Sequence, residues 1–95
     1  MSLTLLDPEL NDLGAGEGGW MVVIYNNDHT DMGDVMEILI RATHCDEQEA
    51  YLEMWEAHTF GKAPVHFAGR EVCDEAAAII ASIGVKAEVM KEWND

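Results

Sequence analysis

The sequence predicts an α+β fold, a two-layer sandwich in which three strands pack against three helices in the order β-α-α-β-α-β. Two patterns predict it. Short apolar runs bounded by turn residues are typical of strands, and they alternate with longer segments whose apolar residues recur at the i, i+3, i+4 spacing of one helix face. Three strands with helices on one face make two layers. Ninety-five residues are enough for one domain with a small core.

The chain divides into two parts. Residues 1–19 hold acidic residues, a proline and a glycine-rich run at 14–19, with no core-forming pattern, so we expect a disordered N-terminal extension. Its extended length is about 60 Å, at roughly 3.3–3.6 Å per residue. We expect the folded core domain to cover residues 20–95.

The first strand is expected at residues 20–25, an apolar run that stops at three short polar residues favouring turns. A helix is expected at 31–43, with Thr30 as a candidate N-cap and Asp31 in its first turn. The inward stripe of this helix is predicted to comprise Met32, Val35, Met36, Leu39 and Thr43.

The second helix is expected to begin at Asp46, which forms a capping-box-like pattern with Glu49, and to end near Gly61. The residues predicted to face inward are Ala50, Tyr51, Met54, Ala57 and His58.

A strand is then expected at 63–68, a third helix at 70–83 that Gly84 ends, and a last strand at 85–90. The third helix is predicted to bury Val72, Ala76, Ile79, Ile80 and Ile83.

The net charge of −14 argues against nucleic acid as a partner, because only five basic residues are present to meet phosphates. It permits a basic protein partner or a cationic ligand. No apolar run is long enough to span a membrane, and no signal peptide is visible. Cys45 and Cys73 have no second cysteine nearby, which favours reduced thiols. We therefore expect a cytoplasmic protein that binds neither nucleic acid nor membrane.

The loop after the first strand is the candidate site. It holds the Asp28 carboxylate and the Asn26 amide, and His58 lies on the second helix on the same face as Met54. A peptide α-amino group, with a pKa of about 7.7–8.0, is mostly charged at neutral pH. Binding it requires hydrogen-bond acceptors and one negative charge to offset desolvation. These groups suit a small cation beside an apolar pocket, and a free peptide N-terminus is such a cation.

These segments resemble the ClpS family of adaptors, which hand proteins with destabilising N-terminal residues to Clp-type unfoldases. The family carries an Asn-Asp-Asp-x-Thr-x-Met loop after its first strand, and residues 26–32 here read Asn-Asn-Asp-His-Thr-Asp-Met. It also has a His-x-x-Gly-Lys-Ala segment closing its second helix, and residues 58–63 read His-Thr-Phe-Gly-Lys-Ala. The resemblance covers roughly residues 20–76 without a gap. It implies the same order of elements and an antiparallel sheet.

The resemblance also implies a function. The chain would bind the free N-terminus of proteins starting with Leu, Phe, Tyr or Trp and deliver them to a ClpA- or ClpC-type AAA+ unfoldase for degradation. It would act as a monomer, without cofactor, metal or catalytic residue, and the N-terminal extension would help to pass the substrate on. The implied residues are Asn26, Asp28 and His58 for the α-amino group, Thr30, Met32, Val35, Met54 and Ala57 for the hydrophobic pocket, and Glu71 for the unfoldase contact. In the family the Met that matches Met32 is a gate that excludes β-branched side chains.

Several positions depart from the family pattern. Asn27 replaces a common Asp, which removes one charge from the loop. Asp31 and Gly33 replace the usual Pro and Glu, so the reciprocal capping contact is lost. Ala57 stands where a larger aliphatic residue is frequent, which favours a roomier pocket. Ala76 occupies the place of a Lys that helps to contact the unfoldase.

Three other classes of protein compete with this interpretation. A Cys–His hydrolase would use Asp28, His58 and Cys73, but the acids at 71–75 should raise the thiol pKa, and no phosphate loop or nucleophile elbow appears. A protein-interaction domain with a ribosomal-stalk-like fold shares the predicted architecture, yet it would need an exposed basic helix face, which this chain lacks. A metal-binding module would draw on scattered residues without paired spacings, namely His29, His44, Cys45, His58 and His66.

Overall fold

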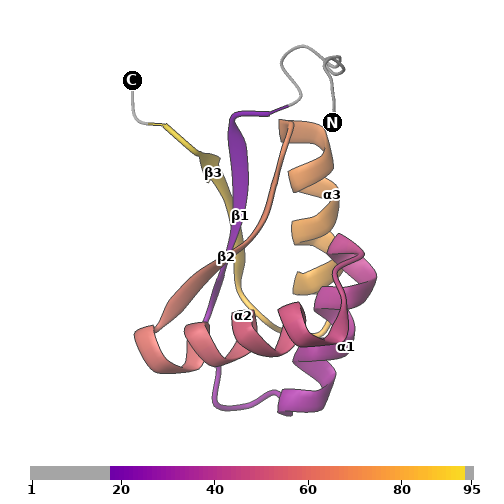
Figure 1. Cartoon of the computed structure of the whole chain (residues 1–95), viewed down its shortest axis with the longest axis vertical. Coiled ribbons are helices and arrows are strands. Elements are labelled where there is room, and N and C mark those ends of the chain that lie inside the picture. The colour runs from indigo at the N-terminus through magenta and orange to yellow at the C-terminus, as the bar shows by residue number, and fades with distance from the viewer. Residues whose placement is uncertain (1–17, 94–95) are drawn as a thin grey trace.

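The computed structural model describes residues 18–93 and has the predicted two-layer α+β architecture (Figure 1). Of the predicted N-terminal extension, residues 1–17 lie outside the described part. The predicted order β-α-α-β-α-β is confirmed. The elements are β1 (Trp20–Tyr25), α1 (Met32–Thr43), α2 (Glu47–Phe60), β2 (Lys62–Ala68), α3 (Arg70–Ala81) and β3 (Ala87–Lys91).

The three strands form one antiparallel sheet in the order β2-β1-β3, as the family resemblance implied. Figure 1 shows α1 and α3 beside the sheet, while α2 crosses near the start of β2. A bulge interrupts the pairing of β1 with β2, because Val22 pairs with His66 and Val23 with Pro64, which leaves Val65 as an extra residue. Pro64 fits here because β2 is an edge strand, where a missing N–H is tolerated.

The core lies between the sheet and the helices. Val22 and Ile24 of β1 are fully buried against Leu39 of α1 and Ile80 of α3. From α2 the buried residues are Ala50, Met54 and Ala57. Two of these are alanines, so the side chains that α2 presents to the core are mostly small.

Several burial predictions were wrong. Tyr51 and His58 of α2 are exposed, because the buried face of this helix is a narrow stripe that leaves both outside. On α3 the inward face is rotated from the predicted one, so that Val72 is exposed and Cys73 is fully buried. The spacing of apolar residues permitted both orientations of α3, and packing against α1, β3 and β1 decides between them. Met32 is also exposed, since it begins α1 at the molecular surface.

Two element ends differ from the prediction. Asp31, rather than Thr30, is the N-cap of α1, and its carboxylate accepts a hydrogen bond from the Gly33 amide at 3.0 Å. The helix therefore gains a cap of its own where the family's reciprocal contact is absent. Helix α3 ends at Ala81, and a turn with Gly84 at φ 92° leads to β3, which begins at Ala87 rather than at residue 85.

Among the described residues, no helix has the length and apolar character needed to cross a bilayer.

Candidate functional site

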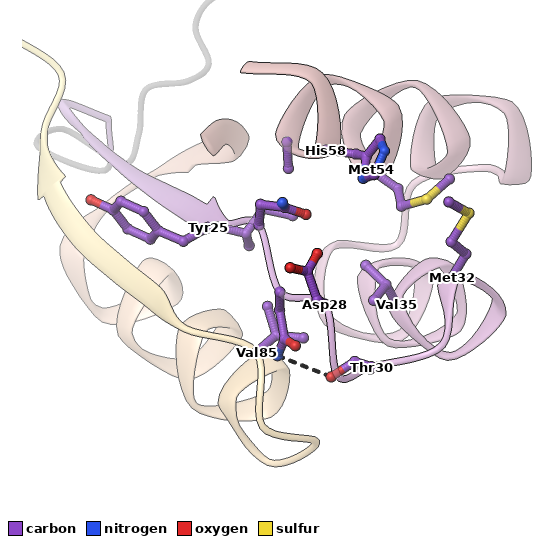
Figure 2. Close-up of a pocket in the computed structure, with 12 residues that line it drawn as sticks. Tyr25, Asp28, Thr30, Met32, Val35, Met54, His58 and Val85 are labelled. Carbon is purple, nitrogen blue, oxygen red and sulfur yellow. Dashed lines mark hydrogen bonds between the residues drawn. The ribbon is translucent and has the colours of Figure 1, made fainter. Parts of the chain in front are cut away.

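A cavity of about 240 Å³ opens between the loop after β1, the first turns of α1, the second half of α2 and the segment before β3 (Figure 2). All eight residues predicted to bind substrate line it, although what they bind stays a prediction. The lining comprises Ile24, Tyr25, Asn26, Asn27, Asp28, Thr30, Met32, Val35, Met54, Ala57, His58 and Val85.

The loop after β1 is tied to two distant parts of the chain. The Asn27 side-chain amide donates hydrogen bonds to Thr30 Oγ1 and to the Gly84 carbonyl oxygen, both at 3.0 Å. The Asn26 amide N–H donates to the Gly61 carbonyl oxygen at 2.9 Å. The loop is therefore fastened both to the end of α2 and to the turn after α3, which holds its polar side chains in place.

The polar groups lie at the mouth of the cavity. Figure 2 shows the Asp28 carboxylate projecting from the loop into the opening, with the His58 ring on α2 across from it. Asn26, Asp28 and His58 are all exposed, which corrects the expectation that His58 is buried. Water can reach these acceptors, so a charged group can approach them without crossing an apolar barrier.

The apolar groups lie on the side formed by the two helices. Val35 of α1 and Met54 and Ala57 of α2 are buried. Met32 is 53% exposed and lies at the rim, and Figure 2 shows its thioether on the same side of the cavity as that of Met54. The site thus joins hydrogen-bond acceptors to an apolar pocket within one small cavity.

Four lining residues were missed by sequence reasoning. Ile24 and Tyr25 belong to the predicted first strand, and Val85, which is buried, follows Gly84. Asn27 was predicted to favour a turn and to remove one charge from the loop, but not to line the site. The position of Val85 carried no signal, because it reaches the site through the packing of α3 and β3. A signal existed for Asn27, since an Asn between two other loop residues often bonds to the nearby backbone.

A small network holds Tyr25 at the edge of the site. Its hydroxyl donates to Glu88 Oε1 at 2.7 Å, and Lys86 Nζ lies 4.7 Å from the centre of its ring. This hydrogen bond raises the pKa of Tyr25 and is the main cause that lowers the pKa of Glu88. The network links the end of β1 to β3 beside the cavity.

The residues expected to contact the unfoldase lie elsewhere. Glu71 is exposed on α3 and does not line the cavity. Ala76 is only 2% exposed and packs in the core, so it presents no side chain to a partner. The two positions therefore do not share one surface in this chain.

Among the described residues, the side chains that a Cys–His hydrolase or a metal-binding module would need do not lie together. Cys73 is fully buried and does not line the cavity; burial first, and then the charges of Asp74 and Glu92, raise its thiol pKa. The sequence predicted correctly that the pKa of Cys73 is raised. It attributed the shift to nearby acidic residues, whereas burial of the thiol is the larger cause. Cys45 and Cys73 are both free. Across residues 18–93, no three His, Cys, Asp or Glu side chains are placed together to hold a metal ion.

The described residues form a small α+β domain with a cavity that is polar at its mouth and apolar inside. A model of the ClpS family, described as ATP-dependent Clp protease adaptor protein ClpS, matches residues 16–88. The chain therefore belongs to the ClpS family, as its motifs predicted, and this is a family of adaptors rather than enzymes.

A solved structure gives the same fold. The chain is similar to ClpS2 of Agrobacterium tumefaciens bound to L-phenylalaninamide, with a TM-score of 0.74 and 22% sequence identity over 81% of this chain and 99% of that one. At this identity the likeness establishes the fold. No match to this chain was found among curated proteins.

Proposed function

We propose that this chain is an adaptor that binds the free N-terminus of proteins beginning with Leu, Phe, Tyr or Trp and delivers them to a Clp AAA+ unfoldase–protease. The observation that carries the proposal is the meeting of exposed acceptors and an apolar pocket in one cavity of about 240 Å³. Membership of the ClpS family supports it. So does the fold shared with a protein that binds L-phenylalaninamide, a ligand with an amino group and an aromatic ring.

The α-amino group would be held by three acceptors at the mouth of the cavity. Asp28 supplies the negative charge, Asn26 an amide oxygen, and neutral His58 one ring nitrogen. An ammonium group has three N–H donors, so three acceptors satisfy it. Charge-assisted hydrogen bonds of this kind are among the strong ones, and they offset the cost of removing the cation from water.

The side chain of the first residue would occupy the apolar part of the cavity. Its volume of about 240 Å³ is smaller than the roughly 300–1,000 Å³ of sites for drug-sized ligands, which suits one side chain. Met54 and Met32 can adapt to rings and contact them through sulfur, and Thr30 lies at the rim. Met32 would act as the gate, because a β-branched side chain carries its bulk close to the backbone, at the level of the rim where Met32 lies.

Delivery requires features outside the cavity. We assign Glu71, exposed on α3, to the contact with a ClpA- or ClpC-type unfoldase. Because Ala76 is buried, docking must use neighbouring exposed residues in place of the family's Lys. We assign residues 1–19 to the transfer of the substrate and the core domain, residues 20–95, to its recognition. The adaptor would act as a monomer and without a cofactor.

Labelled peptides that differ only in residue 1 test the recognition step. We expect micromolar or tighter binding for free Leu, Phe, Tyr or Trp, because burial of such a side chain is worth about 1.5–3 kcal/mol and each charge-assisted hydrogen bond about 1.5–3 kcal/mol. Acetylation of the N-terminus should abolish binding. Equal affinity for free and acetylated peptides, measured by fluorescence anisotropy, would refute the proposal.

A further inference from the structure

An apolar strip covers the outward side of α2. It consists of Tyr51, Leu52, Trp55 and Phe60, which we call the α2 strip, and all four side chains are exposed. The rings of Trp55 and Phe60 meet edge to face, with centroids 6.1 Å apart and planes at 89°. A surface helix normally has one apolar stripe, which faces the core. Helix α2 has a second one, which faces solvent.

The fold does not account for this strip. The core contacts of α2 are made by Ala50, Met54 and Ala57, which lie on the other side of the helix. Single exposed apolar residues are normal, but a contiguous group of them marks a surface that binds something. Three of the four members are aromatic, and aromatic residues bury large areas in interfaces.

The strip is continuous with the cavity. Trp55 lies three residues before His58 and four after Tyr51, so helix geometry makes each pair neighbours on the surface. His58 lines the mouth of the cavity, and the path from His58 to Tyr51 runs about 10 Å along the helix at 1.5 Å per residue. About three residues of extended polypeptide span that length. A chain that leaves the cavity past His58 toward the start of α2 therefore reaches Trp55 and Tyr51 within its next few residues, and Trp55 is in contact with Phe60.

The charge pattern restricts what can lie on the strip. Glu49 and Glu56 of the same helix are exposed, and the chain as a whole carries a net charge of −14. Two copies of this chain would repel each other, which disfavours self-association through α2. A segment that combines apolar side chains with lysine or arginine complements both the strip and the acids.

We propose that the α2 strip binds the residues just after the N-terminal residue of the same substrate chain, and that it selects apolar or aromatic side chains there, accompanied by basic ones. This inference rests on the proposed function, which places residue 1 in the cavity, and it defines the substrates more narrowly. A preferred substrate would have two apolar anchors, the first residue in the cavity and a second one on Trp55.

Two peptides that share their first residue test this inference. Both begin with a free Phe and carry the same lysines; the test peptide has Trp and Leu at positions 3 and 4, and the control peptide has Ser at both. We expect roughly three- to tenfold tighter binding of the test peptide, from contacts between aromatic rings. The double variant W55S/F60S should remove this difference and leave the affinity for the control peptide unchanged.

A matched variant, Phe67→Ser, removes an exposed ring from β2 and should preserve the difference. Equal affinities of the two peptides for the unmodified protein would overturn the inference and leave recognition of residue 1 intact. Absence of binding by both would overturn the proposed function as well. Binding of the acetylated test peptide as tightly as the free one would overturn the inference together with the proposed function, because residue 1 would then not be recognised by its free amino group. The two peptides are compared on the unmodified protein, without any substitution. The test therefore remains decisive even if one of the variants fails to fold.

Discussion

The side chain of Asn27 donates two hydrogen bonds, to Thr30 Oγ1 and to the Gly84 carbonyl oxygen, and its own oxygen accepts one from the His29 amide. A carboxylate at this position has no N–H to donate, and it would face the Gly84 oxygen at 3.0 Å. The Asn that replaces the family's common Asp therefore stabilises the loop through hydrogen bonds that an Asp could not donate. Its role is to position the acceptors on either side of it.

Substitution of Asn27 by Asp tests this role. We expect the free energy of unfolding to fall by about 0.5–1.5 kcal/mol, because the two hydrogen bonds donated by the Asn27 amide are lost. Peptide affinity should fall as well, despite the added negative charge. Urea denaturation and peptide titration measure the two effects. Gln48→Glu, which adds the same charge at an exposed position on α2, should change neither; tighter peptide binding by Asn27→Asp would contradict this account.

Asp28 and His58 are predicted to be the most sensitive residues of the site. Asp28→Ala and His58→Ala should each weaken peptide binding by about 2–5 kcal/mol, the cost of removing one partner of a desolvated charge. Both side chains are exposed, so the fold should persist, as circular dichroism can verify. Asp34→Ala removes an exposed acid from α1 that does not line the cavity, and it should bind normally. Unchanged affinity in folded Asp28→Ala would refute its assignment.

At the scale of elements, the two ends of α2 determine where His58 lies relative to the cavity. Asp46 accepts a hydrogen bond from the Glu49 amide at 2.8 Å, and Gly61, at φ 93°, ends the helix with its N–H donating to the Ala57 carbonyl oxygen at 2.8 Å. The positive φ is one that glycine adopts readily. These caps set the length of the helix, and therefore place His58 in its last turn, above the cavity.

Glu53 makes the stability of α2 depend on pH. Its Oε1 atom is buried without a hydrogen-bond partner, and burial, followed by the charge of Glu49, raises its pKa from 4.5 to about 8. The folded state therefore holds a proton between these pH values that the unfolded state releases. It follows that stability is greatest below pH 4.5, as far as this group is concerned, and declines as the pH rises to about 8.

Glu53→Gln should remove this dependence. We expect the variant to melt at a higher temperature than the unmodified protein at pH 8, and the gap between the two to narrow toward pH 4.5. Thermal unfolding at several pH values gives the comparison. Glu75→Gln, at an exposed position on α3, serves as the control. A gap that does not change with pH would show that Glu53 is ionised in the folded protein.

At the scale of the whole molecule, the cavity is separate from Glu71, the residue that we assign to the unfoldase contact. The cavity is built from β1, α1, α2 and the segment before β3, whereas Glu71 lies on α3. The described fold begins at its N-terminal end with Gly19, whose carbonyl oxygen accepts from the Glu92 amide at 2.9 Å.

The sequence of residues 1–18 is rich in glycine near its end and has no core-forming pattern. Deletion of Met1 to Gly18 should leave peptide affinity and thermal stability unchanged and abolish stimulated degradation by a cognate Clp unfoldase–protease. Peptide titration and a degradation assay on full-length and truncated protein measure the two activities. Equal degradation rates would remove the extension from the mechanism. Stimulation by neither protein would indicate that the chain binds N-termini without serving this unfoldase, a result that the burial of Ala76 would help to explain.

Local features of the sequence determined the elements and the family. The bounds of β1, the Asp46 cap and the Gly61 end of α2 were predicted correctly, because strand runs, caps and C-terminal glycines act through neighbouring residues. The two motifs identified the ClpS family, and through it eight residues that the structure brings to one cavity. That inference used the family's arrangement, since nothing local places Asn26 near His58.

Only the tertiary structure decided which way the elements face. Apolar periodicity fixes a helix face only approximately, so it could not say that Cys73 is buried and Val72 exposed, or that Tyr51 lies outside the core. The place of Val85 in the cavity likewise depends on how α3 and β3 pack. Burial is a property of pairs of elements, and the sequence of one element does not contain the surface that covers it. For the same reason, the sequence could not show that the α2 strip is exposed. The structure shows it, because Ala50, Met54 and Ala57 on the other side of α2 make the core contacts.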